Sequence, residues 1–273
     1  MIPKIVHQIY WDFDKPEVTE PPAQWARFSS GLQASLPDWH YVRWDKQMCV
    51  ALLKQKYPWF LERFNAYPYP VMQADGIRPF ILYTYGGVYI DMDFTCVRRF
   101  DDLLGNGISL LPRFDVRKLP SAHLRGAFTK SFTNSFIGSP AGHPFWHLVF
   151  EGLLNASWDW LYYISKHFYI MQSTGPGLLT RCARQYGGDD IHVLSLDALN
   201  PCDVCTPQCE KSDEVRCYTT HASSWHGADS QLINIFQCNV KTLCLLWIVI
   251  VTVLFFMLLQ KCHVQYPNVS VII

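Results

Sequence analysis

Residues 73–93 read QADGIRPFILYTYGGVYIDMD, and the prediction of the fold begins with them. The apolar spacing within Met72–Tyr85 predicts a helix, with Pro79 expected to kink it or to lie in its first turn. The pair Gly86-Gly87 is typical of a helix end. Val88–Asp91 then predicts a short strand that terminates in carboxylates. A helix that leads through a tight turn into a strand is typical of an α/β protein.

The same alternation continues on both sides of this stretch. Runs rich in β-branched and aromatic residues predict further strands at Ile2–Trp11, Trp39–Trp44, Ile108–Leu111, Ser135–Ile137 and Ile191–Leu196. Helical patterns predict helices at Lys46–Lys56, Trp59–Asn65, Pro144–Leu154 and Gly177–Tyr186. We therefore expect an α/β fold with a mostly parallel central sheet. His7, inside the first predicted strand, is interpreted as a core histidine whose hydrogen bonds are satisfied.

The composition excludes several classes of protein. Of the 273 residues, 49% are hydrophobic, 15% aromatic and 17% charged, and 23 Lys and Arg balance 23 Asp and Glu. A disordered chain has low hydrophobicity and high net charge, and a nucleic-acid binder has a basic excess, so we expect neither. Several membrane spans would need several apolar runs of about 20 residues, whereas this sequence has one long run.

That run is Leu243–Leu259, LCLLWIVIVTVLFFMLL, with Thr252 as its polar residue and a lysine on each side. It predicts a single transmembrane helix at residues 243–260, followed by a short tail at 261–273. A buried core helix is the alternative. No apolar run follows Met1, so we expect no signal peptide. The flanking lysines balance, so the positive-inside rule does not orient the chain. A single C-terminal anchor without a signal peptide would leave residues 1–240 in the cytosol, and a lumenal location is the alternative.

Four cysteines cluster within an insertion at residues 201–218. Their spacing, C-x2-C-x3-C-x7-C, joins Cys202, Cys205, Cys209 and Cys217. In a reducing compartment this spacing predicts a structural zinc site. In a lumen it predicts two local disulfides. Both alternatives remain open at this point.

Asp91 and Asp93 are the first candidate site residues. They lie two residues apart at the end of a predicted strand, so their side chains are expected on the same side of it. Two adjacent carboxylates repel each other unless a cation lies between them, and Mg²⁺ or Mn²⁺ take such oxygen ligands together with phosphates. Ligands bind at the carboxyl ends of strands in open α/β sheets. We therefore expect a metal–diphosphate site.

Asp75 and Arg78 are the second pair. They lie three residues apart on the predicted helix and therefore share a face. The turn at Gly86-Gly87 brings that face towards the strand end. An acidic residue for ribose, an arginine for phosphate and an acidic pair for metal together predict a nucleotide-sugar site.

Three segments carry a resemblance to a known family. IPKIVHQIYW at residues 2–11, ADGIRPFILYTYGGVYIDMD at 74–93 and NSFIGSPAGHPFW at 134–146 are similar to glycosyltransferase family 32, the DXD sugar-binding family. YPYPVMQADGIR, STGPG and HASSWHGADS resemble the subgroup that mannosylates inositol phosphorylceramide. The resemblance covers most of residues 1–230. It implies a GT-A fold, an α/β/α sandwich, over residues 1–240, and transfer from a nucleotide sugar with retention, using Mn²⁺ or Mg²⁺.

The resemblance also implies roles for individual residues. Asp91 and Asp93 would bind metal and diphosphate, and His221 would complete the metal site or touch the diphosphate. The donor and acceptor cleft would be lined by residues spread along the chain, namely Tyr10, Asp75, Arg78, Asn134, Gly175 and Trp225. Tyr10 departs from the family pattern, which usually has a tryptophan there to stack on the base.

The function that the resemblance implies is membrane-anchored mannosyl transfer from GDP-mannose to an inositol phosphorylceramide-type lipid, on an ER or Golgi-type membrane. Whether a regulatory subunit is needed is left open. One alternative is another donor, UDP-galactose or UDP-glucose, or a glycan or protein acceptor. An alternative of another class is a non-catalytic membrane adaptor in which the cysteine cluster binds zinc. No nucleic-acid partner is expected.

Overall fold

The computed structural model of the protein divides into two compact units, Met1–Gly227 and Ala228–Ile273. The residues that it describes are 1–115, 117, 122, 126, 129–155, 159–202, 204–206, 212–220, 227–239 and 251–252. In the second unit the described part is helical at residues 228–239 and 251–252. The predicted catalytic residues that the structure describes all belong to the first unit.

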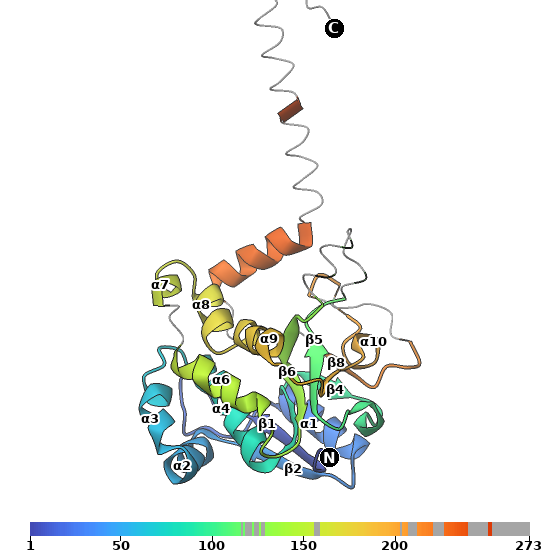
Figure 1. Ribbon diagram of the computed structural model, residues 1–273. Helices are drawn as coiled ribbons and strands as arrows, with labels where there is room; N and C mark the ends of the chain where they lie inside the picture. The colour runs from blue at the N-terminus through green and yellow to red at the C-terminus, as the bar shows by residue number, and fades with distance from the viewer. Residues whose placement is uncertain are drawn as a thin grey trace, which may run out of the picture. The chain divides into compact units, whose positions relative to one another are not determined.

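The centre of the first unit is a mixed sheet (Figure 1). Its order within the described residues is β2-β1-β3-β6-β5-β7. The pairs β1/β2, β1/β3 and β5/β7 are parallel, whereas β6 runs opposite to its neighbours β3 and β5. The bounds of the six strands are β1 Ile5–Ile9, β2 His40–Trp44, β3 Gly87–Ile90, β5 Ile108–Pro112, β6 Phe132–Ser139 and β7 Ile191–Val193. The predicted α/β class and mostly parallel sheet are confirmed.

Helices pack on both faces of this sheet. Their bounds are α1 Ala23–Ser35, α2 Lys46–Lys56, α3 Pro58–Asn65, α4 Pro70–Tyr85, α6 Phe145–Leu154, α7 Asp159–Tyr162, α8 Lys166–Ser173, α9 Pro176–Gln185 and α10 Leu196–Leu199. Tyr89 and Ile137 point into a core shared with α2, α3, α4, α6, α8 and α9. Their strand neighbours Val88 and Phe136 point into a second core with α1 and α10. Alternation along the strands thus fills both faces and produces three layers.

Helix α4 is the element that carries Asp75 and Arg78. It begins with Pro70 at its first position, where a missing N–H costs nothing, and Pro79 lies inside it rather than at its start. Gly86 and Gly87 follow with φ of 64° and 96°. A Cβ on Gly87 would lie 2.5 Å from the Ile5 carbonyl oxygen, so glycine is required where the chain turns into β3. The predicted helix, glycine stop and strand are confirmed.

His7 links this turn to the sheet. The indole Nε1–H of Trp44 donates to Nδ1 of His7 at 3.1 Å, which leaves Nε2–H to donate to the Gly86 carbonyl at 2.8 Å. The ring is 1% exposed. Burial lowers the pKa of His7 to about 4, so the imidazole is neutral at physiological pH. The interpretation as a satisfied core histidine is confirmed.

Some elements differ from the prediction. Residues 191–196 are not one strand, because β7 ends at Val193 and Ser195 caps the short helix α10 with its hydroxyl. Helices α1 and α8 were not predicted. Neither was a second, two-stranded sheet in which β4 (Phe94–Cys96) pairs antiparallel with β8 (Cys217–Thr219).

The predicted transmembrane helix at 243–260 lies outside the described residues, except for 251–252. Within the part of the chain that the structure does describe, no helix combines the length and apolar character of a membrane span. The tail at 261–273 is likewise outside the described residues.

Candidate active site

The site forms where parallel strands β1 and β3 end. Val6 and His7 of β1 lie opposite Val88 and Tyr89 of β3, so both strands run to the same edge. Asp91 follows β3 at this edge, and the side-chain amide of Gln8 donates to its backbone carbonyl at 3.2 Å. This is the carboxyl edge at which open α/β sheets bind ligands.

Gln8 was missed by the sequence analysis. Its Oε1 accepts hydrogen bonds from the Ser29 hydroxyl at 2.7 Å and from the Tyr41 hydroxyl at 2.9 Å. These bonds orient the amide so that its nitrogen faces the Asp91 carbonyl. The signal available in the sequence was a glutamine inside an otherwise apolar predicted strand. Such a residue is expected to be buried, as Gln8 is, and a buried amide needs hydrogen-bond partners.

Arg78 joins the two predicted acidic positions. Its Nη2 lies 2.9 Å from Oδ1 of Asp75 and 3.1 Å from Oδ1 of Asp91. Its Nη1 donates to the backbone carbonyl of Asn134 at 2.8 Å. The Arg78 side chain is 8% exposed, so these ionic contacts are poorly screened by solvent. The helix face and the strand end therefore meet as predicted, through a buried guanidinium.

Tyr89 supports both charged groups and was also missed. Its hydroxyl donates to Oδ1 of Asp91 at 2.7 Å, and the Arg78 guanidinium carbon lies 4.5 Å from the centre of its ring. A cation over an aromatic face is an attractive contact. Tyr89 and Asp91 are two residues apart at the strand end, so strand alternation could have placed them together.

Asn134 and Gly175 reach the same cluster from distant elements. Nδ2 of Asn134 donates to Oδ1 of Asp75 at 3.0 Å. A Cβ on Gly175 would lie 3.4 Å from Oδ2 of Asp75 and 3.2 Å from the Ile170 carbonyl, so this backbone approaches closely. Asp75, Arg78, Asn134 and Thr174 also line a small cavity between α4, β6, α6 and α9. The structure thus brings Asn134 and Gly175 to Asp75. Their predicted place in a donor and acceptor cleft stays a prediction.

The charges in this cluster carry a desolvation cost. Burial raises the pKa of Asp75, against the opposing effects of Arg78 and Asn134. Burial, opposed by Arg78 and assisted by the Asp93 carboxylate, raises the pKa of Asp91 to about 7. The Asp91 side chain is nevertheless 29% exposed, so it can reach an outside ligand. A cation bound there would favour its charged form.

Asp93 is held by a separate part of the chain. Strand β3 ends at Ile90, and Phe94 N–H donates to the Asp91 carbonyl at 3.2 Å. The two aspartates are therefore brought near each other by a turn, and the expectation that both lie along one strand is wrong. Oδ2 of Asp93 accepts from the Thr219 hydroxyl at 2.9 Å, a contact that was not predicted.

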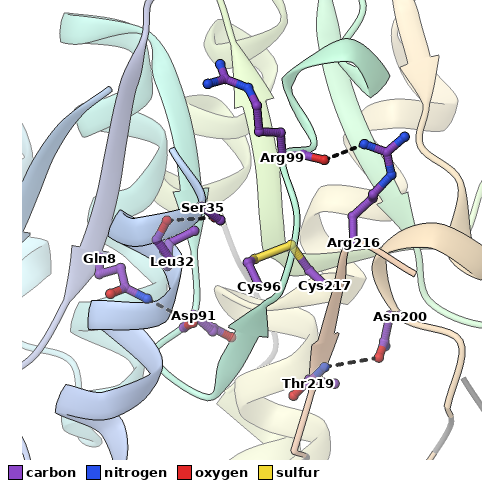
Figure 2. Close-up of a disulfide and its surroundings, with 10 residues drawn as sticks. All are labelled: Gln8, Leu32, Ser35, Asp91, Cys96, Arg99, Asn200, Arg216, Cys217 and Thr219. Atoms are coloured by element: carbon purple, nitrogen blue, oxygen red, sulfur yellow. Dashed lines mark hydrogen bonds between the residues drawn. A yellow bond between two sulfur atoms is a disulfide. The ribbon is translucent and has the colours of Figure 1, made fainter. Parts of the chain in front are cut away.

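A disulfide fastens this second region. Cys96 and Cys217 lie directly opposite each other in β4 and β8 and are bonded across a sequence separation of 121 (Figure 2). Arg216 adds a hydrogen bond from Nη1 to the Arg99 carbonyl at 2.7 Å, drawn in the same view. Strand β8 is thereby held against β4 immediately after Asp93.

The prediction of zinc at the cysteine cluster is wrong. Cys217 is bonded to Cys96, which lies outside the cluster, and Cys202 and Cys205 are also disulfide-bonded. Cys209 lies outside the described residues. Sulfurs in disulfides lack the thiolate that zinc requires. The disulfide alternative is thus correct for these three residues, although Cys217 does not pair locally, and the zinc module of the adaptor alternative is lost.

The remaining predicted residues differ in what the structure describes. His221 and Trp225 lie outside the described residues, which break off after Thr220 and resume at Gly227. The last described residue before this gap is Thr220, whose N–H donates to the Asp93 carbonyl at 3.0 Å. Tyr10 follows β1, is 9% exposed and lies edge-on to Trp25 with ring centres 5.7 Å apart.

Two carboxylates fit a hard divalent cation. Among the described residues, no group of three or more His, Cys, Asp and Glu side chains is arranged to hold a metal ion. Both contacts of the Asp91 carboxylate use its Oδ1, so the lone pairs of Oδ2 face no described partner. One or two carboxylates completed by substrate phosphates is the usual way in which Mg²⁺ is bound.

Comparisons with known proteins agree with this geometry. Residues 22–109, which include Asp75, Arg78, Asp91 and Asp93, match the family model of the glycosyltransferase sugar-binding region containing the DXD motif. The match covers the sugar-binding region alone, and it agrees with the predicted enzyme class, glycosyltransferase. Asn134 and Gly175 lie beyond the matched residues.

The relatives come from the predicted subgroup. The chain is 33% identical to the mannosyl phosphorylinositol ceramide synthase CSH1 of Saccharomyces cerevisiae, over 88% of this chain and 57% of that protein. It is 36% identical to the inositol phosphoceramide mannosyltransferase 2 of Schizosaccharomyces pombe, over 64% of this chain and 44% of that protein. The chain spans about half the length of the curated relatives it matches. The predicted resemblance is confirmed.

Among solved structures, the PaToxG glycosyltransferase is similar to this chain. The two are 16% identical with a TM-score of 0.48, and the match covers 67% of this chain and 69% of the other.

Proposed function

We propose that the chain is a metal-dependent, retaining glycosyltransferase that moves mannose from GDP-mannose to an inositol phosphorylceramide-type lipid. The observation that carries this proposal is the pair Asp91 and Asp93 at the carboxyl edge of the sheet, connected through Arg78 to Asp75. The names of the relatives support mannose as the sugar and inositol phosphoceramide as the acceptor. The α/β/α layering supports a GT-A fold.

The proposed metal ligands are Asp91, Asp93 and His221, with Mn²⁺ or Mg²⁺ as the cation. When bound, the cation neutralises the charge that develops on the leaving diphosphate. Arg78 faces three protein oxygens, so we assign it the role of positioning Asp91 and Asp75 rather than touching phosphate itself. Thr220 contacts Asp93, and His221 is the next residue after Thr220 in the sequence, which supports His221 as a ligand.

The donor is proposed to extend from this edge. Asp75, fixed by Arg78 and Asn134, would contact the ribose or the sugar, and Gly175 would let the α9 terminus approach it closely. Tyr10 and Trp225 would cover the base and the diphosphate.

The proposed reaction is attack from the same face as the leaving group. The acceptor hydroxyl oxygen bonds to the anomeric carbon as the bond from that carbon to the diphosphate breaks, and the hydroxyl proton passes to the departing phosphate oxygen. This route needs no carboxylate nucleophile. Asp75, a buried carboxylate of this cluster, is engaged by Arg78 and Asn134 through its Oδ1.

Membrane attachment is part of the proposal. The apolar run at residues 243–259 would anchor the chain in an endomembrane and hold the cleft near a lipid headgroup. The names of the relatives, which refer to ceramide lipids, support such a location.

The test is lipid analysis of cells that express the full chain. Wild type is expected to give a new mannosylated inositol phosphorylceramide band, and Asp91→Ala/Asp93→Ala is expected to give none. The matched control, Asp14→Ala/Asp189→Ala, removes two exposed carboxylates and should keep the band. Transfer at the wild-type rate by the Asp91→Ala/Asp93→Ala chain would show that the site is misassigned. A change in glycoproteins without a lipid band would favour another acceptor.

A further inference from the structure

The segment around α7 and α8 exposes an unusual group of large apolar side chains. Tyr163 is 86% exposed, Ile164 68%, Trp160 55% and Phe168 45%. We call these four residues the aromatic cap. They lie within nine residues of the chain, whereas single exposed apolar residues scattered over a surface are ordinary. A concentrated apolar surface usually marks an interaction site.

Buried residues and hydrogen bonds fix the backbone that carries the cap. Leu161 is buried in the main core, and its carbonyl accepts from the N–H of Ile164 at 3.0 Å and of Ser165 at 2.9 Å. The Ser165 hydroxyl caps α8 by accepting from Phe168 N–H at 3.3 Å. Tyr162 stacks on Tyr69 with ring centres 6.0 Å apart. The exposed side chains are therefore presented outward by a well-packed base.

The chemistry of the cap fits the interfacial zone of a bilayer. Tryptophan and tyrosine combine an apolar ring with a polar tip and concentrate at membrane–water interfaces, with aliphatic residues reaching deeper. Lys166 lies beside the cap, with its ammonium 5.0 Å from the centre of the Tyr69 ring, where its charge suits lipid phosphate. The same chain carries the apolar run at 243–259, from which the sequence predicts a membrane anchor. A membrane is therefore the partner that we choose for the cap.

The cap is also connected directly to the active site. Helix α8 runs from Lys166 to Ser173 and leads into Gly175, whose backbone lies against Asp75. Eight helical residues span about 12 Å. A bilayer that receives the cap would therefore lie about one short helix away from the donor site, which is a suitable distance for a lipid headgroup to reach it.

We propose that the aromatic cap inserts into the interfacial layer of the membrane that holds the acceptor lipid and so orients the cleft towards that layer. The evidence for the bilayer contact is the exposed cap and the packed residues beneath it. The orienting role in sugar transfer rests on the proposed function. The bilayer contact is in addition to any anchor formed by the apolar run.

Hydrogen exchange of the full chain tests the contact without needing activity. The chain is compared in lipid nanodiscs and in amphipol, which keeps the chain in solution without supplying a bilayer. We expect peptides covering residues 159–168 to exchange at least five-fold more slowly in nanodiscs than in amphipol. Peptides covering β7, where Val193 is exposed, should exchange equally in both.

Substitutions identify the side chains responsible. Trp160→Ser/Tyr163→Ser/Ile164→Ser is expected to abolish the nanodisc protection, and Tyr163→Trp should keep it because the ring remains. The matched control, Val18→Ser/Val193→Ser, removes exposed apolar residues elsewhere and should keep it as well. Unchanged protection in the triple variant, with the same melting temperature as wild type, would overturn the proposal.

Other occupants give different results. Protection in amphipol that grows with protein concentration would show a second copy of the chain on the cap. Protection in amphipol at every concentration would show that another segment of the same chain covers it. Either result overturns the bilayer contact.

Activity measurements separate this inference from the proposed function. With the acceptor lipid in nanodiscs, the triple variant should transfer mannose at least five-fold more slowly than wild type. Its metal-dependent hydrolysis of GDP-mannose should be unchanged. Equal transfer rates would overturn the orienting role. Bilayer protection of the cap in a wild-type chain that transfers no mannose would refute the function and leave the contact standing.

Discussion

The two aspartates of the D-x-D sequence are held in different ways. Asp91 is held by the Tyr89 hydroxyl and by a charge, the Arg78 guanidinium at 3.1 Å, which is supplied by the helix that precedes it in the chain. Asp93 is held by a neutral hydroxyl, that of Thr219 at 2.9 Å, which follows it by 126 residues. Figure 2 shows the disulfide that keeps this second contact in place. The two proposed metal ligands thus depend on unrelated parts of the sequence.

The difference teaches which perturbations each ligand responds to. The Asp91 side, made of Asp75, Arg78 and Asn134 around Asp91, is stabilised by buried charges, which are costly when one partner is lost. The Asp93 side, made of the pair Cys96–Cys217 and Thr219, is stabilised by a covalent cross-link and weaker neutral bonds. Four predictions separate the two sides, beginning with the largest effect.

Loss of Arg78 should break the Asp91 side. Arg78→Met leaves Asp75 and Asp91 without their cation, and breaking a buried ion pair from one partner costs about 3–5 kcal/mol. Urea unfolding measures this cost, and adding Asp75→Asn should recover part of it. Arg99→Met, which removes exposed ion pairs, should cost less than about 1 kcal/mol. An equal cost for both arginines would contradict the distinction between the two sides.

Removing the disulfide should break the Asp93 side. Cys96→Ala/Cys217→Ala opens a closed loop with a sequence separation of 121. A loop of this size is worth about 5 kcal/mol in the chain-entropy model, and disulfides typically contribute about 2–4 kcal/mol. The variant should also need more Mn²⁺ for half-maximal transfer, because β8 is freed from Asp93. Arg216→Met, which removes a hydrogen bond between the same segments, is the control. If transfer by the double variant keeps the wild-type Mn²⁺ dependence, the disulfide does not position Asp93.

Acid should weaken the turn that follows α4. His7 is buried neutral with its pKa lowered to about 4, so its stabilising contribution is complete above its unfolded value of 6.5 and is lost as pH falls towards 4. The shift corresponds to about 3 kcal/mol. Comparing wild type with His7→Gln by urea unfolding isolates this part from other titrating groups. The difference in the free energy of unfolding should shrink between pH 7 and pH 4, and a constant difference would rule out this linkage.

The smallest effect is expected at Thr219. Thr219→Val keeps the shape of the side chain but removes the hydroxyl that binds Oδ2 of Asp93, at a cost of about 1 kcal/mol in stability. The Mn²⁺ concentration for half-maximal transfer should rise several-fold. Thr220→Val removes only a bond to the Asp93 backbone carbonyl and should leave the Mn²⁺ dependence unchanged. A rise of equal size in both variants would show that the hydroxyl of Thr219 has no special role.

The Asp91 side could largely be predicted because its information is local. Helical spacing placed Asp75 with Arg78, the double glycine placed the turn, and the run after it placed Asp91 at a strand end. The local pattern could not predict which residues from distant parts of the chain contact Asp75 and Arg78. Asn134 approaches from β6, and only the family resemblance indicated that it would come near.

The Asp93 side could not be predicted, for two physical reasons. Strands β4 and β8 are three residues each, too short for alternation to be recognised, and their paired cysteines are separated by 121 residues in the sequence. The cysteine spacing was also misleading. Cys217 lies in a local cluster of cysteines in the sequence, but it forms its disulfide with Cys96, outside that cluster. Sequence spacing constrains which cysteines are near in the chain, not which are bonded.

The reversed direction of β6 has a consequence for how this architecture diversifies. Pro112 at the end of β5 lies opposite Phe132 at the start of β6, so residues 113–131 leave and rejoin the sheet at the edge where Asp91 lies. A crossover between parallel strands would instead have to return from the far edge. Insertions or deletions in this connection can therefore change the surroundings of Asp91 while every strand keeps its register.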